Sequence, residues 1–202
     1  NTGKELRRFN GNAGAVVDLS ISPDGGSLIA SSGEVDYLGT PFQSYGLILW
    51  DMETGEIIYD FGNLDRDNPT VSISSACTHV LSERGDDQTQ TKEELCTSYA
   101  LIGSTDHNLY QWDLQTGELI KTLEGHSDLV TSLAISPDGR KALSGDGNGE
   151  VILWNLDSGE IIARFNAHSS WVTDIAFNLD GRSAFSLALD DRIIQWDLHN
   201  AA

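Results

Sequence analysis

Apolar and polar residues alternate with a period of two along most of this chain. The alternation is clearest over Val130–Ile135 and Val172–Phe177. Such a period predicts β-strands with one buried face. After the first of these runs, further short apolar runs follow at residues 141–144 and 151–154, separated by glycine-containing turns. No segment has the length and period of an amphipathic helix, so the pattern predicts an all-β fold of short antiparallel strands.

A tryptophan-centred string recurs four times and marks an internal repeat. The strings are Leu49-Trp50-Asp51, Gln111-Trp112-Asp113, Leu153-Trp154-Asn155 and Gln195-Trp196-Asp197. Thr-Gly or Ser-Gly pairs recur in phase with them, as do the turns Ser22-Pro23-Asp24-Gly25 and Ser136-Pro137-Asp138-Gly139. The landmarks divide the chain into units of about 1–53, 54–115, 116–157 and 158–202. Each unit has room for four strands.

These units resemble the WD40 repeat, because the Trp-Asp strings stand in register with Ser-Pro-Asp-Gly turns and with the pair Gly125-His126. The resemblance covers essentially the whole chain. It implies a β-propeller of four-stranded antiparallel blades, with four blades here, as part of a seven- or eight-bladed ring. Four blades alone leave exposed sheet edges, which natural β proteins avoid. The chain also begins inside a repeat, at an expected outer strand over residues 5–9. We therefore expect the ring to be closed by the rest of a longer parent chain or by a second copy.

The resemblance also implies a structural network of histidine, serine, aspartate and tryptophan in each blade. The fourth unit has all four residues, the third has asparagine for aspartate, and the first two units keep only part of the set. The matching residues are His168, Ser186, Asp190 and Trp196; His126, Ser144, Asn148 and Trp154; Asp106 and Trp112; and Trp50, with Asn12 at the histidine position. A His-Ser-Asp trio is also typical of hydrolases. Here it recurs at fixed repeat positions without a nucleophile elbow, so we interpret it as structural and predict no enzyme activity.

Two segments exceed the basic repeat length. Residues 34–45 are expected to form a loop on the face where this family docks partners, and its aromatic side chains either anchor a partner or fold onto their own blade. The candidate contact residues are Tyr37, Phe42, Tyr45, Asp128, Trp171 and Asp191; Trp171 is either a contact or a packing residue. Residues 83–94 are polar, and their composition predicts a mobile hairpin tip.

The two cysteines, Cys77 and Cys96, bracket this polar segment. They are expected near the end of one strand and the start of its antiparallel partner, where facing positions satisfy disulfide geometry. They form either a disulfide or two buried thiols. A disulfide implies an extracytoplasmic location, and reduced thiols a cytoplasmic one. Two thiols and His79 leave no fourth zinc ligand, and the acidic residues of the segment lack calcium-loop spacing. We predict no metal and no cofactor.

The charge balance excludes one class of partner. The 202 residues include 31 acidic and 12 basic ones, for a formal net charge of −19. A nucleic-acid binder needs basic residues to displace phosphate counterions, so nucleic acid is not an expected ligand. No apolar run is long enough to span a membrane. The expected function is a non-catalytic scaffold that docks other proteins on its propeller face and rim. The alternatives are a structural subunit of a larger assembly and a ligand-binding or hydrolytic propeller.

Overall fold

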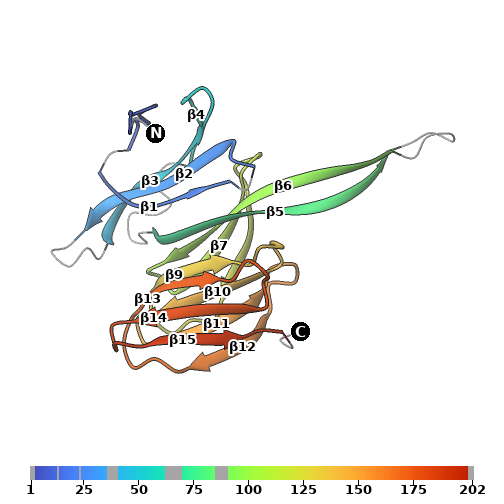
Figure 1. Cartoon of the computed structure of the whole chain (residues 1–202). Helices are drawn as coiled ribbons and strands as arrows, with labels where there is room; N and C mark the ends of the chain where they lie inside the picture. The colour runs from blue at the N-terminus through green and yellow to red at the C-terminus, as the bar shows by residue number, and fades with distance from the viewer. Residues whose placement is uncertain are drawn as a thin grey trace.

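The computed structural model describes residues 3–12, 14–22, 24–35, 41–61, 70–84 and 91–199. Over these residues the chain forms four antiparallel sheets in chain order (Figure 1). The strands are β1 (Ala15–Ile21), β2 (Ser27–Val35), β3 (Pro41–Asp51), β4 (Ile57–Asp60), β5 (Thr70–Arg84), β6 (Thr91–Ser104), β7 (Asn108–Asp113), β8 (Leu119–Glu124), β9 (Val130–Ile135), β10 (Lys141–Asp146), β11 (Glu150–Asn155), β12 (Ile161–Asn166), β13 (Val172–Phe177), β14 (Ser183–Ala188) and β15 (Ile193–Asp197). The predicted all-β architecture of antiparallel blades is confirmed.

Each of the first three sheets has four strands in simple up-and-down order, and the fourth sheet has β13, β14 and β15. We call these sheets blades 1 to 4. The first strands of successive blades, β1, β5, β9 and β13, contact one another and form the inner side of the array. The expected outer strand over residues 5–9 is not a strand: the segment is irregular, although Phe9 still packs edge-on against Trp50. Within the described residues, no strand forms a backbone ladder with it. Closure of the ring stays a prediction.

The residue after each tryptophan shapes the turn that follows. Asp113 accepts hydrogen bonds from the backbone N–H groups of Gln115 and Thr116 at 2.7 and 3.0 Å. Asn155 does the same in the next blade with its side-chain oxygen. The chain then passes through a glycine of positive φ, which is 69° at Gly117, a conformation that glycine adopts without steric cost. The recurring Trp-Asp and Thr-Gly strings are therefore parts of one turn.

Both extended segments lengthen hairpins. The backbone of Glu34 pairs with that of Gln43, so Phe42 and Tyr45 lie in β3 and not in the predicted loop. Similarly, β5 and β6 remain paired out to Arg84 and Thr91, and their outer ends extend away from the other sheets (Figure 1). Antiparallel backbone pairing needs no apolar side chains, which is why polar composition alone did not predict these strands. Residues 85–90, expected to be mobile, lie outside the described part of the chain.

Blades pack through their faces, and small residues permit the close approach. Gly145 on β10 lies under Val172 of blade 4, such that a Cβ built on Gly145 would stand 2.4 Å from Val172 Cγ1. Leu143, Val151 and Leu153 surround this contact and are fully buried. Within the described residues, no helix is long and apolar enough to cross a lipid bilayer.

Gly145→Ala is expected to lower the free energy of unfolding by about 1–3 kcal/mol, because the added methyl overlaps Val172 and forces the two blades apart. Chemical denaturation of both proteins measures the difference. Gly26→Ala is the matched control, since its new methyl would lie at 3.4 Å or more from any neighbour. Equal stability of the two variants would show that the blade interface tolerates the extra volume.

Candidate functional site

A buried polar network lies in blade 3, at the end where β10 turns into β11. His126, in the loop before β9, is buried with its Nδ1 3.2 Å from Asp146 Oδ2 and its Nε2 2.6 Å from Ser144 Oγ. The indole Nε1–H of Trp154 donates to the same Ser144 oxygen at 2.7 Å. Asp146 also accepts from the backbone N–H groups of Asn148 and Glu150. The network thus ties the inner loop to the β10–β11 turn.

Only one proton arrangement satisfies every group in this network. Ser144 Oγ accepts the Trp154 N–H, so its own hydroxyl proton is available to His126 Nε2. His126 then carries its ring proton on Nδ1 and donates it to the carboxylate of Asp146. The serine side chain is fully buried between the two rings. A nucleophile must be reachable by its substrate, so this arrangement favours the structural interpretation of the His-Ser-Asp trio over the hydrolytic one.

Blade 4 repeats the arrangement with the residues that the sequence pattern indicated. His168 Nδ1 lies 3.2 Å from both carboxylate oxygens of Asp190, and its Nε2 lies 2.7 Å from Ser186 Oγ. Trp196 Nε1 donates to Ser186 Oγ at 2.9 Å. The backbone N–H of Ser169 is the main cause that holds the pKa of Asp190 below its ordinary value, with His168 contributing. The structure therefore brings all four predicted residues together.

In blade 3 the aspartate position was assigned wrongly. Asn148 stands four residues after Ser144, as Asp190 does after Ser186, but its side chain is directed to Ser127 Oγ at 3.4 Å. Asp146, only two residues after Ser144, supplies the carboxylate instead. The turn is short enough for a carboxylate at either position to reach the imidazole. A search of the whole turn for a carboxylate, in place of one fixed position, would have found Asp146.

The described residues of blades 1 and 2 do not form this network. Trp50 Nε1 donates to the backbone oxygen of Asn10 at 3.2 Å, while the side-chain oxygen of Asn12, at the histidine position, is buried and has no partner in the described segments. In blade 2, Trp112 Nε1 is buried with no partner among the residues that the structure describes, and Asp106 bonds to Tyr110 instead. The sequence pattern identified the positions of these residues, but it did not indicate that their network hydrogen bonds are lost or replaced by other contacts among the described residues.

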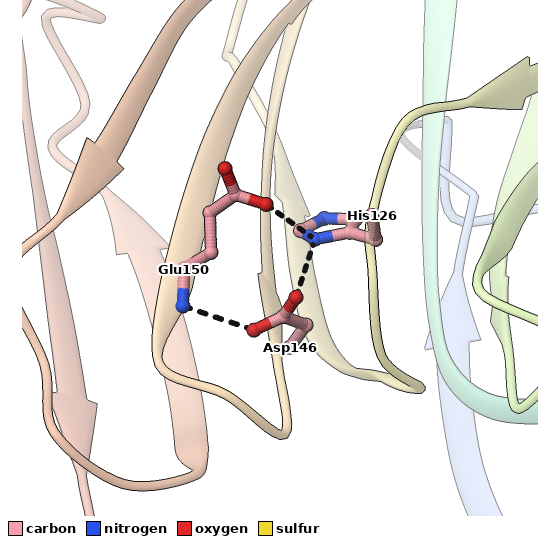
Figure 2. A group of neighbouring side chains, drawn as sticks. All are labelled: His126, Asp146 and Glu150. Carbon is pink, nitrogen blue, oxygen red and sulfur yellow. Dashed lines mark hydrogen bonds and ion pairs between the residues drawn. The ribbon is translucent and has the colours of Figure 1, made fainter.

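Glu150 brings a second carboxylate to His126 (Figure 2). Its Oε2 lies 3.8 Å from His126 Nδ1, and Arg164 on β12 pairs with both of its oxygens at 2.9 and 3.0 Å. His126, Asp146 and Glu150 are close enough to share a metal ion. A metal on Nδ1 would move the ring proton to Nε2, however, and the buried Ser144 hydroxyl would lose its acceptor. The hydrogen-bonded arrangement, reinforced by Arg164, is the one these contacts favour.

Asp146→Asn is expected to lower stability at pH 7 by about 1–3 kcal/mol, because it removes a charge-assisted bond to His126. Burial acts to raise the pKa of Asp146, but the bonds from His126 and the Glu150 N–H outweigh it and hold that pKa below its ordinary value. The stabilisation is thus fully present above about pH 3.9, the unfolded value, and is lost as the pH falls through the lower folded value.

Urea unfolding of the wild type and of Asp146→Asn at pH 7, 4 and 3 measures this linkage. The stability difference between the two proteins should shrink below pH 4. A difference that stays constant down to pH 3 would show that the carboxylate charge does not stabilise the fold.

The predicted partner-contact residues fall into two groups. Asp128, Trp171 and Asp191 lie at the same end of blades 3 and 4 as the histidine networks. The Trp171 side chain is 36% exposed, and its backbone oxygen accepts from Leu189 N at 2.9 Å. Tyr37 lies outside the described residues, and for Phe42 and Tyr45 the structure describes the backbone alone.

The cysteines lie on adjacent strands, within the long β5–β6 hairpin and not near strand ends. The backbone register pairs Cys77 with Ser98 and His79 with Cys96, so the two cysteines are diagonal neighbours and not directly opposed. Their side chains lie outside the described part of the structure. The disulfide, and the location that it implies, stay predictions.

Four antiparallel blades that contact one another through their inner strands, two of them carrying a His-Ser-Asp-Trp network, define a β-propeller array. The family model described as "WD domain, G-beta repeat" matches residues 3–35, 117–155 and 159–197, which together make up more than half of the chain. The chain belongs to the WD40-repeat family. The matches leave out the second unit, which is also the blade whose tryptophan N–H has no partner among the described residues.

Similar curated proteins carry the same repeat. Autophagy-related protein 16 of Arabidopsis thaliana is 25% identical over 71% of this chain and 31% of its own length. The guanine nucleotide-binding protein subunit beta of Zea mays is 26% identical over 71% of this chain and 32% of its own. The chain therefore spans about a third of the length of these relatives.

Two solved structures share the fold. The computationally designed Ika4 protein superposes with a TM-score of 0.67 at 21% identity, over 97% of this chain and 99% of that one. The designed Ika8 protein gives 0.65 at 20% identity, over 94% of this chain and 48% of that one. Proteins with WD repeats generally act as protein-interaction scaffolds, and the described residues show no arrangement that indicates catalysis.

Proposed function

We propose that this chain is a scaffold that binds a basic peptide segment of a partner protein on the loop surface of blades 3 and 4. The observation that carries the proposal is the exposure of Trp171 between two rigid loops. His168, three residues before it, is held by Asp190 and Ser186, and Trp171 itself bonds through its backbone to Leu189. An aromatic side chain on a backbone that is held in place binds with less loss of conformational entropy than one on a mobile loop.

The charge around this tryptophan favours a basic partner. Asp191, in the β14–β15 turn, has a φ of 61° and an exposed side chain. Asp128 lies in the neighbouring loop of blade 3. The whole chain carries a formal net charge of −19, which attracts cationic segments and speeds their association. Trp171 also offers an aromatic face to a lysine or arginine side chain.

Selection from a random peptide library displayed on phage tests the proposal. We expect the wild-type protein to enrich Lys/Arg-rich peptides. Synthetic copies of these peptides should bind the Trp171→Ala, Asp191→Asn double variant at least tenfold more weakly than the wild type. A loss of this size is expected when a hot-spot residue of an interface is removed. Leu179→Ala is the matched control, because Leu179 is an exposed apolar residue in the turn at the opposite end of blade 4. Peptides that are not basic, or that bind wild type and double variant alike, would refute the proposal.

A further inference from the structure

One register position differs between the last blade and the other three. It is the residue of each second strand that pairs with the third-strand residue three positions before the tryptophan: Ser31 with Leu47, Gly103 with Leu109, Gly145 with Val151 and Leu187 with Ile193. The first three blades have serine or glycine at this position, and blade 4 has leucine. The difference matters because this position faces the next blade.

A valine of the following blade fills the space that each glycine leaves. A Cβ built on Gly103 would stand 2.6 Å from Val130 Cγ1, and one built on Gly145 would stand 2.4 Å from Val172 Cγ1. Val130 and Val172 are the first residues of their inner strands, and both are fully buried. A glycine beneath a valine is therefore a contact that recurs at both interfaces, between blades 2 and 3 and between blades 3 and 4.

The matching surface of blade 4 is apolar and uncovered. We call it the blade-4 flank; it consists of Phe185, Leu187 and Ile193, which are 39%, 38% and 74% exposed. The equivalent residues of blade 3 are Leu143, Gly145 and Val151, by the same strand pairing, and blade 4 buries them completely. Continuity of the stack thus identifies what covers such a flank, namely the inner strand of another blade.

The first inner strand of this chain would not fit the blade-4 flank in that way. Val16 of β1 pairs with Ser32, as Val172 of β13 pairs with Ala188, so Val16 is the equivalent valine. Val16 is 50% exposed, whereas Val172 is fully buried. A single methyl on Gly145 would already overlap its valine, and Leu187 places four carbon atoms at the corresponding position.

We propose that the blade-4 flank binds the inner strand of a WD40 blade that carries glycine or alanine where Val172 stands in blade 4. Leu187 selects this partner by size. It fills the space above a small residue and overlaps a valine, so it excludes a second copy of this chain that presents Val16. Specificity here comes from steric exclusion of the wrong partner as well as from burial of the right one.

Sedimentation velocity of the full chain tests the proposal, with the chain itself as the probe blade. Leu187→Gly recreates the glycine-valine contact for a second copy, and Val16→Ala creates the small residue that Leu187 accepts. We expect the wild type to sediment as a single copy, and each variant to self-associate at least tenfold more strongly. High salt, about 0.5 M, screens the repulsion between two acidic chains.

Ile58→Gly is the matched control, since Ile58 is an exposed apolar strand residue on β4, away from both surfaces, and should behave as the wild type does. Circular dichroism checks that each variant is folded. If Leu187→Gly disrupts β14, the Val16→Ala variant decides the test. Wild type that associates as strongly as the variants would overturn the proposal. So would folded variants that remain single copies.

Discussion

Replacing Trp154 with alanine is expected to lower the free energy of unfolding by about 3–5 kcal/mol, the usual cost of removing a large buried aromatic side chain. Trp154 is fully buried in the cluster formed by Leu101, Leu133 and Ile152, among others. Its removal leaves a cavity at the contact between blades 2 and 3. It also takes from Ser144 one of its two hydrogen-bond partners. Because a domain is stable by only about 5–15 kcal/mol, this one change would remove a large share.

Equilibrium denaturation followed by circular dichroism measures the effect. Trp171→Ala is the control: the same substitution at a tryptophan that is partly exposed at the loop surface should cost much less. If both variants lost equal stability, the indole of Trp154 could not be acting as the centre of the interface. The same conclusion would follow if Trp154→Ala changed the fluorescence of the protein but not its free energy of unfolding.

The sequence predicted the architecture because each recurring string has a local physical cause. Trp-Asp and Thr-Gly mark one turn, in which Asp113 binds two backbone N–H groups and Gly117 adopts positive φ. Ser136 and Asp138 mark another, closed by their own side chains. Such turn interactions recur wherever the same residues recur, so the repeats within one sequence are enough to predict them.

The contacts between side chains were less predictable. Asp146 replaces Asn148 in the blade 3 network, since two positions of one short turn are within reach of the same imidazole. Glu150 and Arg164 join this site from separate strands, and nothing in the repeat pattern indicated them. The length of β5 and β6 was missed for a different reason: backbone pairing leaves no mark in composition.

Replacing Ser144 with alanine is expected to lower stability by about 2–5 kcal/mol, although it removes a single oxygen atom. That oxygen accepts the Trp154 N–H and donates to His126 Nε2, so two buried groups lose their partner together. Each unsatisfied buried group costs about 1–3 kcal/mol. Urea denaturation measures the loss, and Ser127→Ala, at an exposed serine whose side chain receives one long bond from Asn148, is the control.

The other blades show why the expected cost depends on what surrounds the missing hydroxyl. Blade 1 has Ala30 at the strand position of Ser144, and its Trp50 N–H donates to the backbone oxygen of Asn10 instead. Blade 2 has Ile102 there, and its Trp112 N–H has no hydrogen-bond partner among the described residues. Within the described part of the chain, the Trp154 N–H donates to Ser144 Oγ and to no backbone oxygen, so Ser144→Ala should resemble blade 2 and not blade 1. A variant as stable as the wild type would mean that blade 3 can recruit a substitute acceptor, and the serine would then not be what holds the two rings in place.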